Sequence, residues 1–188
     1  MNLHQPVEDK TLLDKFSEEV AKIVGKHCKY AIVSGFVAIA SGRSRGTEDI
    51  DMIIERIDKD TFKRIHSDLI KAGFEALQGS SADKLYDLYL ADNLSLRYVK
   101  KGSYVPELEL KLAKDRLDED QLKNRVKLPL TGLDIYFSSI ETNIAFKEEL
   151  LKSEKDLEDA RHLRIVYSDK ITEEEINRIK NMIKSLRK

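Results

Sequence analysis

The chain has 188 residues, enough for one medium-sized domain or for a domain with a small helical appendage. Hydrophobic residues make up 41% of the chain, which is sufficient for a core. Its 33 Lys and Arg residues nearly balance its 34 Asp and Glu residues, so the net charge is −1. This balance does not indicate a protein that binds nucleic acids or membrane surfaces through its overall charge.

The N-terminal stretch contains no apolar signal segment, and no apolar stretch approaches the ~20 residues that a membrane span needs. The single cysteine, Cys28, cannot form an intramolecular disulfide. It precedes an apolar run without an obvious His or Asp partner, which favours a buried structural thiol over a nucleophile. These features predict a soluble, cytoplasmic protein with no membrane partner.

Three elements are expected before the first notable polar cluster. Apolar residues at helical spacing predict a helix over about residues 8–26. The next apolar run predicts a short buried strand that ends at Gly35. Residues 36–42 are apolar and small, which fits one or two turns of buried helix that Gly42 ends.

Residues 49–55 are apolar at every other position, which predicts a half-buried strand. Its apolar face is formed by Ile50, Met52 and Ile54. Asp49 and Asp51 therefore point together to the opposite face, along with Ile53. A helix with apolar residues from Phe62 to Ile70 follows, and Gly73 ends it.

The middle of the chain predicts a mixture of helix and strand. Residues 81–93 predict a further short helix, and residues 94–113 predict two antiparallel strands joined through 100–103. In the second of these strands, leucines alternate with Glu107 and Glu109, which places both carboxylates on the polar face. Residues 127–137 predict one more strand. Of the four histidines, His27, His66 and His162 are scattered on helical segments and His4 lies in the leading tail, and we interpret them as solvated or helix-capping.

Beyond residue 137 the sequence predicts helices alone. Ser138 to Glu141 has the pattern of a capping box, and further helix starts are predicted at 153–156 and 172–175. The predicted fold class is therefore α+β (α/β), with a mixed sheet flanked by helices. We expect residues 1–137 to form this core and residues 138–188 to form a helical segment packed on it.

Asp49 and Asp51 are the first candidates for a functional site. Two positions apart on a strand, their carboxylates lie within reach of one hard cation such as Mg²⁺ or Mn²⁺, which carboxylates, waters and substrate phosphates hold together. A carboxylate from a neighbouring strand would complete the site. Glu109 is the first choice for it, Glu107 the second and Asp134 the third.

An acidic pair on a strand is also common on ordinary protein surfaces. The loop before this pair, residues 42–48, contains Gly, Ser, Arg and Thr. Its N–H groups and guanidinium groups suit phosphate oxygens. The loop therefore favours a metal–nucleotide site over an ordinary acidic strand.

These residues resemble the nucleotidyltransferase superfamily, which has a polymerase-beta-like fold. Its signature is a Gly-(Gly or Ser) pair after the first strand, followed about a dozen residues later by Asp-x-Asp on the second. Here Gly35 precedes Asp49-Ile50-Asp51 in this way. "RGTEDID" is similar to the Arg-x-Thr-x-Asp-x-Asp of the branch with the AbiEii-type toxins. "NIAFKEELLKSEKDLEDARHL" also resembles that branch, so the resemblance covers roughly residues 28–165.

The resemblance implies an enzyme that transfers an NMP from an NTP, such as ATP or GTP, to a hydroxyl of RNA, protein or a small molecule. It implies that Asp49, Asp51 and Glu109 are catalytic and bind the metal. The residues that it implies for nucleotide binding are Ser34, Gly35, Arg43, Arg45, Thr47, Lys147, Lys155, Asp156 and Asp159.

Other interpretations remain open at the level of sequence. The arginines and lysines of this set are also typical of solvated surfaces, and acidic residues in a first helical turn favour the helix N-terminus. The second position of the family's glycine pair holds Phe36, with Ser34 before the glycine. The alternative function is a nucleotide- or RNA-binding, or partner-regulating, module with weak or no catalysis. A third option is a structural protein that interacts through its helical tail.

Overall fold

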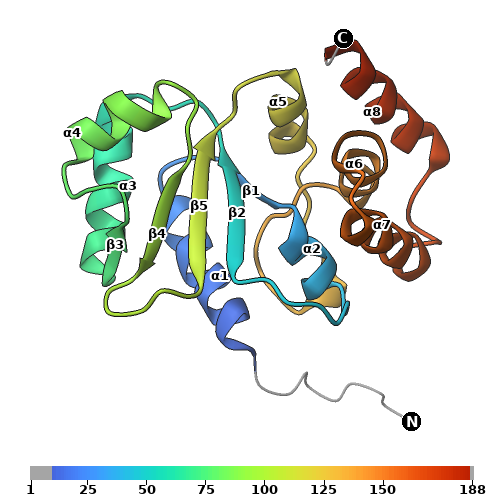
Figure 1. The fold of residues 1–188 in the computed structure, drawn as a ribbon, viewed down its shortest axis with the longest axis horizontal. Helices are drawn as coiled ribbons and strands as arrows, with labels where there is room; N and C mark the ends of the chain where they lie inside the picture. The colour runs from blue at the N-terminus through green and yellow to red at the C-terminus, as the bar shows by residue number, and fades with distance from the viewer. Residues whose placement is uncertain (1–9, 187–188) are drawn as a thin grey trace.

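The computed structural model describes residues 10–186 of the chain. At its centre is a five-stranded mixed sheet with the strand order β1-β2-β5-β4-β3 (Figure 1). The strands are β1 (Tyr30–Val33), β2 (Asp49–Ile54), β3 (Phe74–Ala76), β4 (Leu96–Lys100) and β5 (Glu107–Leu112). β2 runs parallel to β5, and the other three neighbouring pairs are antiparallel.

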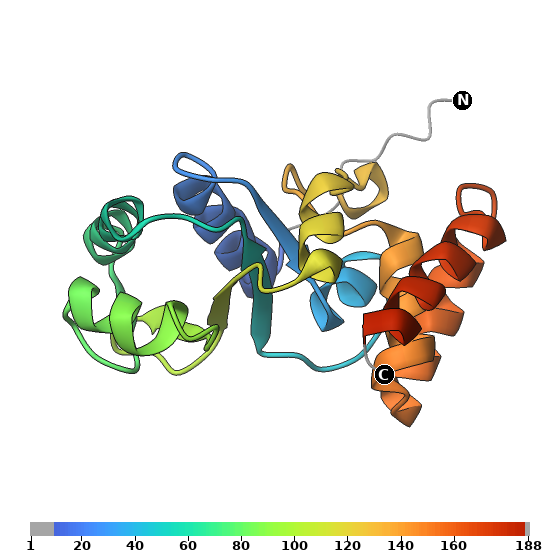
Figure 2. The same cartoon turned by 90° about the horizontal axis from the view of Figure 1, so that it is seen from above.

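The α-helices are α1 (Leu12–Val24), α2 (Gly35–Ala40), α3 (Lys59–Lys71), α4 (Ala82–Leu85), α5 (Arg116–Lys123), α6 (Ile140–Phe146), α7 (Glu154–Val166) and α8 (Glu173–Leu186). π-helical turns extend α4 as η1 (Tyr86–Leu90) and α6 as η3 (Lys147–Leu151), and η2 (Pro129–Thr131) is a 3₁₀ turn. Helices α6, α7 and α8 gather beyond the β1 end of the sheet, whereas α3 and α4 lie at its β3–β4 end (Figures 1 and 2). Between residues 10 and 186, none of the helices combines the length and apolar character needed to cross a bilayer.

The two faces of the sheet differ in what covers them. On one face, the alternating apolar residues of the central strands are buried in the main core together with α1 and α3. From β2 and β5 these residues are Ile50, Met52, Ile54, Leu108, Leu110 and Leu112. The opposite face has only a small apolar cluster around Ile53, which Leu122 of α5 covers. The predicted division of β2 into an apolar and an acidic face is therefore confirmed.

The C-terminal helices join the core through α2. α6 packs against α7 and α8, and α7 packs against α2. The Tyr167 hydroxyl lies 3.1 Å from the Ser41 hydroxyl, and His162 Nε2 donates to the Ser41 carbonyl oxygen at 3.0 Å. These contacts attach the end of α2 to α7, so the loop before β2 lies beside the C-terminal helices.

Most of the predicted elements are confirmed, with shifted ends. The helix expected over 8–26 spans Leu12–Val24, and residues 8 and 9 lie outside the described part. The strand ending at Gly35, the buried helix after it, the helix that Gly73 follows and the helix within 81–93 are present. The two antiparallel strands within 94–113 are also present.

Of the predicted helix starts, those at Ser153 and Thr172 are confirmed, because each hydroxyl accepts the backbone N–H three residues further on. The predicted cap at Ser138 is wrong. Ser139 caps α6 instead, whereas the Ser138 hydroxyl is buried and accepts a hydrogen bond from the Asn143 amide at 2.8 Å.

The predicted strand over 127–137 is also wrong. The segment contains η2, and of its residues Phe137 alone forms β-bridges, one to Ile32 of β1 and one to Val126, which lies outside the sheet. Pro129 lacks the N–H that a strand ladder needs, and Gly132 has a φ of 68°, which turns the chain. Two described elements were not predicted: β3, which has too few residues for alternation, and the charged helix α5.

Two single residues also differ from or refine the predictions. His66 is buried, not solvated, and its Nδ1 lies 2.9 Å from the Tyr98 hydroxyl. Burial lowers the pKa of His66, so the neutral imidazole is favoured. Cys28 is half-buried, and burial raises the pKa of its thiol to about 12. This value fits a structural thiol and not a nucleophile.

The packing of α8 predicts a contrast between two isoleucines. Ile179 on α8 is 1% exposed, whereas Ile165 on α7 is 69% exposed. We expect Ile179→Ala to lower the free energy of unfolding by about 2–5 kcal/mol, because it leaves a cavity in the core. Ile165→Ala, the matched control, should change it by no more than about 0.5 kcal/mol. Urea denaturation followed by circular dichroism measures both, and equal losses would contradict this packing.

Candidate functional site

Four carboxylates lie in two register pairs on the less covered face of the sheet. Asp49 is the partner of Glu107, and Asp51 is the partner of Glu109, on the neighbouring parallel strands β2 and β5. Adjacent strands are about 4.8 Å apart, so the pairs are neighbours across the ladder. The structure therefore brings both of the first two choices for the third carboxylate beside the aspartate pair.

Asp134, the third choice, lies elsewhere. Its carboxylate is exposed and pairs with Lys127 at 2.5 Å. It lines a separate cavity with Tyr30 and Tyr136, next to α1. The structure therefore does not bring Asp134 to the carboxylate face.

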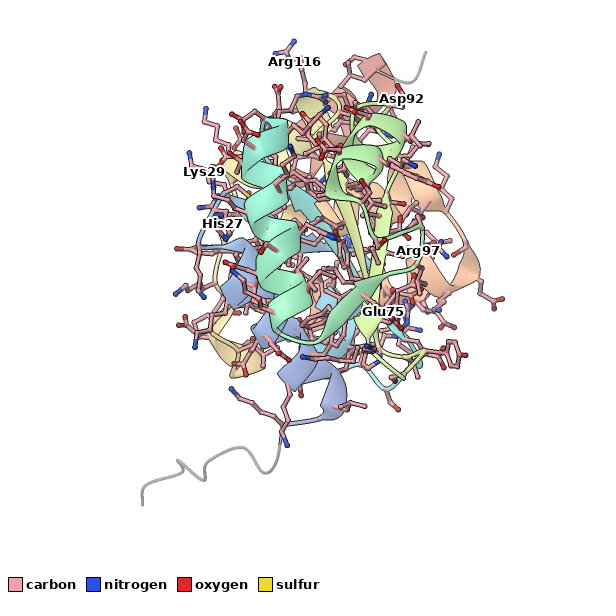
Figure 3. All side chains as sticks on the ribbon, turned by 90° about the vertical axis from the view of Figure 1, so that its left-hand side faces the viewer. His27, Lys29, Glu75, Asp92, Arg97 and Arg116 are labelled. Atoms are coloured by element: carbon pink, nitrogen blue, oxygen red, sulfur yellow. The ribbon has the colours of Figure 1, made fainter. Side chains whose placement is uncertain are left out.

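Arg97 on β4 is a member of this face that the sequence did not reveal. Its Nε lies 3.3 Å from Glu107 and its Nη2 lies 3.7 Å from Glu109. Figure 3 shows Arg97 on the opposite side of the molecule from His27 and Lys29. Within residues 10–186, no three His, Cys, Asp or Glu side chains are already placed to hold a metal ion together. In this arrangement, Arg97 is the counter-ion of the two glutamates.

Asp51 has the most perturbed environment of the aspartate pair. Burial raises the pKa of its carboxyl, and a hydrogen bond from the Ser34 hydroxyl opposes this effect. The negative charges of Glu109 and Asp49 raise the pKa further, whereas Lys111 lowers it. Burial also raises the pKa of Glu107. A cation placed among these carboxylates would relieve both the repulsion and the cost of burying charge.

Ser34 connects the strand β1 to the helix α2 in a strained conformation. Its φ of 67° and ψ of −137° lie in a region that residues other than glycine rarely adopt. At the next residue, a Cβ on Gly35 would lie 2.8 Å from Nη2 of Arg45. A side chain at position 35 would therefore displace Arg45. The Ser34–Gly35 turn thus directs one hydroxyl to Asp51 and lets a guanidinium pack against the start of α2.

Phe36 follows this turn and belongs to the core. It is 1% exposed, and its ring centroid lies 6.2 Å from that of Phe137. The aromatic side chain therefore does not enter the carboxylate face. The residue of this turn that carries a hydroxyl is Ser34, because the position after Gly35 holds Phe36.

A buried carboxylate gathers the basic residues. Asp159 on α7 is fully buried and forms ion pairs with Arg43, Arg45 and Lys147, the last at 2.8 Å. Asp156 lies 3.3 Å from the Lys147 ammonium. Burial lowers the pKa of Lys147, and it also lowers the pKa of Arg45. Five of the residues proposed from sequence for nucleotide binding therefore form one cluster.

The side chains of two other residues of that set lie outside the cluster. The Lys155 side chain is exposed, and it is the backbone carbonyl of Lys155 that accepts a hydrogen bond from Arg43 at 3.0 Å. Thr47 is half-buried in the loop before β2.

An open cavity of about 190 Å³ joins the two groups of residues. Ser34, Asp51 and Lys111 line it from the sheet, and Asn143 and Lys147 line it from the C-terminal helices. Asp51, a carboxylate suited to a cation, and Lys147, a cationic residue, thus line the same space. This cavity and the adjoining carboxylate face form the candidate site.

Known structures share this fold. ANT(2'')-Ia in complex with adenylyl-2''-tobramycin is 13% identical, with a TM-score of 0.59 over 95% of this chain and 100% of that chain. An antigenic nucleotidyltransferase-like protein from Paracoccidioides brasiliensis is 20% identical, with a TM-score of 0.54 over 92% and 88%. The solution structure of the antibiotic-resistance factor ANT(2'')-Ia gives a TM-score of 0.56 at 13% identity, over 93% and 94%.

These similarities define the class of fold. The chain has an α+β nucleotidyltransferase fold, as the sequence predicted, and its structural neighbours are nucleotidyltransferase-like proteins. No protein-family model matches the sequence, and no curated protein matches it either. At these identities the likeness establishes the fold, whereas activity and the AbiEii-type branch are matters of proposal.

The raised pKa of Asp51 predicts that this carboxylate costs stability at neutral pH. The pKa of this carboxyl is higher in the folded protein than in the unfolded chain. Below the unfolded-state pKa the carboxyl is protonated in both states, and its ionisation costs no stability. As the pH rises through the folded-state pKa, the folded protein must carry the buried charge, and stability is lost. We therefore expect Asp51→Asn to raise the free energy of unfolding at pH 7 by about 1 kcal/mol. The gain should shrink as the pH falls toward about 4, the ordinary range of an Asp carboxyl.

Asp49→Asn is the control for this prediction, because Asp49 is exposed on the same strand. It should change the stability by no more than about 0.5 kcal/mol. Urea titrations at several pH values, without divalent cations, measure both variants. A stability loss for Asp51→Asn at pH 7 would contradict the assignment of Asp51 as an electrostatically unfavourable group.

The Asp159 cluster gives a second prediction for this site. Asp159→Ala leaves three cations near one another without their buried partner, and it should destabilise the protein by about 3–5 kcal/mol. Its neighbour Glu158 is exposed and also pairs with Arg43, so Glu158→Ala should cost no more than about 1 kcal/mol. Chemical denaturation distinguishes the two, and similar costs would mean that Asp159 does not hold the cluster.

Proposed function

We propose that the protein is a metal-dependent nucleotidyltransferase that transfers an NMP from an NTP to an acceptor hydroxyl. The observation that supports this most is the register that sets Asp49 and Asp51 against Glu107 and Glu109. The face that they share adjoins a cavity lined by Lys147. The fold is that of nucleotidyltransferases, and one neighbour, ANT(2'')-Ia, was solved in complex with adenylyl-2''-tobramycin.

The donor atoms of this face fit a hard divalent cation such as Mg²⁺ or Mn²⁺. All are carboxylate oxygens, and like charges among them already raise the pKa of Asp51. Asp49 and Asp51 would hold the cation, with Glu109 as the third carboxylate and Glu107 as its alternative. A bound cation would neutralise negative charge on the triphosphate. Glu109 makes the longer contact with Arg97, 3.7 Å, so it is the glutamate that Arg97 holds less closely.

The residues of the chain then have separate tasks in the transfer. The acceptor oxygen forms a bond to the α-phosphorus, the bond to the β-phosphate bridging oxygen breaks, and pyrophosphate leaves. Glu109 accepts the proton of the acceptor hydroxyl. Lys147 lines the cavity and contributes positive charge near the phosphates, while Ser34 orients Asp51.

The rest of the proposed nucleotide-binding set acts mainly by position. Asp159 holds Arg43 and Arg45, which fixes the loop that leads into Asp49. Asp156 supports Lys147. Gly35 has no side chain, so the Arg45 guanidinium can pack against it. We include Thr47 and Lys155 as residues at the rim of the nucleotide site.

The acceptor in this proposal is RNA, a protein or a small molecule, and the branch is that of the AbiEii-type toxins. The similarity of "RGTEDID" in this chain to the Arg-x-Thr-x-Asp-x-Asp pattern of the AbiEii-type toxins supports this branch. We place the activity in the cytoplasm, where NTPs are available and the single free thiol of Cys28 stays reduced.

The proposal predicts that both aspartates are needed for transfer. With α-labelled NTPs, Mg²⁺ and a panel of RNAs, proteins and small molecules, wild type should label at least one acceptor class. Asp49→Asn and Asp51→Asn should each lower labelling by about 100-fold or more. Asp60→Asn, an exposed carboxylate on α3, is the control and should label as wild type does. Unchanged labelling by both site variants would refute the assignment.

The second candidate function is a nucleotide-binding module with weak or no catalysis. It is favoured by ion pairs within the protein that engage the charged groups of the site. Asp159 neutralises Arg43 and Arg45, and Arg97 pairs with both glutamates. Saturable Mg-NTP binding that depends on Asp51, without labelling across the panel, would support this module over the enzyme.

A further inference from the structure

A second, larger cavity lies outside the site described above. Its volume is about 590 Å³, and it is lined by residues just beyond the ends of β2 and β5, including Arg56 and Ala113. Helix α5 separates the two cavities: Glu119 and Lys123 line the larger one, whereas Gln121 lines the one beside Asp51. Lys29 also lines the larger cavity, and Figure 3 shows Lys29 on the opposite side of the molecule from Arg97.

This larger cavity has an excess of positive charge. Its lining contains four cations and two carboxylates, a difference of +2. The cations are Lys29, Arg56, Lys123 and Arg125, and the carboxylates are Glu55 and Glu119. Over residues 10–186, no ion pair within 4.0 Å joins any of these four cations to a carboxylate. The basic cluster around Asp159 is compensated, whereas this one is not.

Two of these cations are held in place by other contacts. Arg56 Nη1 donates to Asn93 Oδ1 at 2.9 Å and to the Ala113 carbonyl at 3.0 Å. The guanidinium of Arg125 lies over the ring of Tyr136, 4.6 Å from its centroid. These contacts reduce the freedom of the side chains while leaving other N–H groups of each guanidinium for a ligand.

The apolar part of the wall and the two carboxylates restrict the ligand further. Leu122 and the half-buried ring of Tyr136 provide a surface for an organic group. Glu55 is engaged in part, because its carboxylate accepts the Lys29 N–H at 2.6 Å. Glu55 and Glu119 interrupt the positive surface, which is unfavourable for the continuous backbone of a nucleic acid.

We propose that this cavity is a binding site for a small phosphorylated molecule, a phosphomonoester or a pyrophosphate compound. A dianionic phosphate matches the charge of +2, and planar guanidinium groups suit phosphate oxygens. The volume is within the range of small-molecule sites. This proposal does not depend on nucleotidyl transfer, because it involves neither the carboxylate face nor Lys147.

The test uses inorganic pyrophosphate as the probe, titrated into the full-length protein by calorimetry in buffer containing EDTA. Without divalent cations, the carboxylate face has no means to attract the probe. We expect saturable one-to-one binding. Lys123→Gln/Arg125→Gln should weaken it by about tenfold or more, because two charge-assisted hydrogen bonds are lost. The matched control Lys170→Gln/Arg161→Gln removes the same charge from exposed positions and should bind as wild type does.

A third variant gives an effect of opposite sign, which loss of folding cannot imitate. Glu119→Gln removes a negative charge from the wall and should tighten pyrophosphate binding several-fold. Lys111→Gln/Lys114→Gln, at the other cavity, should leave it unchanged.

Four outcomes would overturn the proposal. They are the absence of saturable binding, an equal loss in the matched control, a loss confined to Lys111→Gln/Lys114→Gln, and a preference for a single-stranded oligonucleotide over pyrophosphate. None of these results depends on whether the protein transfers nucleotides.

Discussion

The buried carboxylate of Asp159 is the interaction on which the arrangement of the site depends. It accepts three cations that come from different parts of the chain: Arg43 and Arg45 from the loop before β2, and Lys147 from the end of α6. A carboxylate without any exposure is stable only with such partners. Because α7 carries Asp159, the C-terminal helices fix both the loop that leads into Asp49 and Lys147, which lines the cavity beside Asp51.

The site concentrates features that are unfavourable for folding. Ser34 has a backbone conformation suited to glycine, and Asp51 and Glu107 have pKa values raised by burial among like charges. Each of these costs free energy that the surrounding core offsets, since β2 and β5 are buried on their other face. Perturbed carboxylates and strained backbone cluster at functional sites more often than elsewhere, so their coincidence supports a site here independently of any structural relative.

The sequence predicted what depends on local periodicity and not what depends on pairing. Alternation in β2 was sufficient to place Asp49 and Asp51 on one face, and the same pattern placed Glu107 and Glu109 on a face of β5. Their register could not be predicted, because more than fifty residues separate the two strands. The contact of Arg97 with the two glutamates depends on the pairing of β4 with β5, so it could not be predicted either. The burial of Asp159 results from the packing of the helices, which the local sequence of α7 does not determine. The strand expected over 127–137 failed because Pro129 and Gly132 outweigh its apolar composition.

The net charge of −1 conceals a segregation of charge that the fold creates. Carboxylates collect on one face of the sheet, compensated cations collect around Asp159, and uncompensated cations collect beyond α5. Overall composition therefore excludes binding by bulk charge but says nothing about local recognition of anions. α5 has an important place in this arrangement, because opposite sides of one short helix line the two cavities. A ligand bound to Lys123 and one bound beside Lys111 and Lys114 would both contact the connection between β5 and α5.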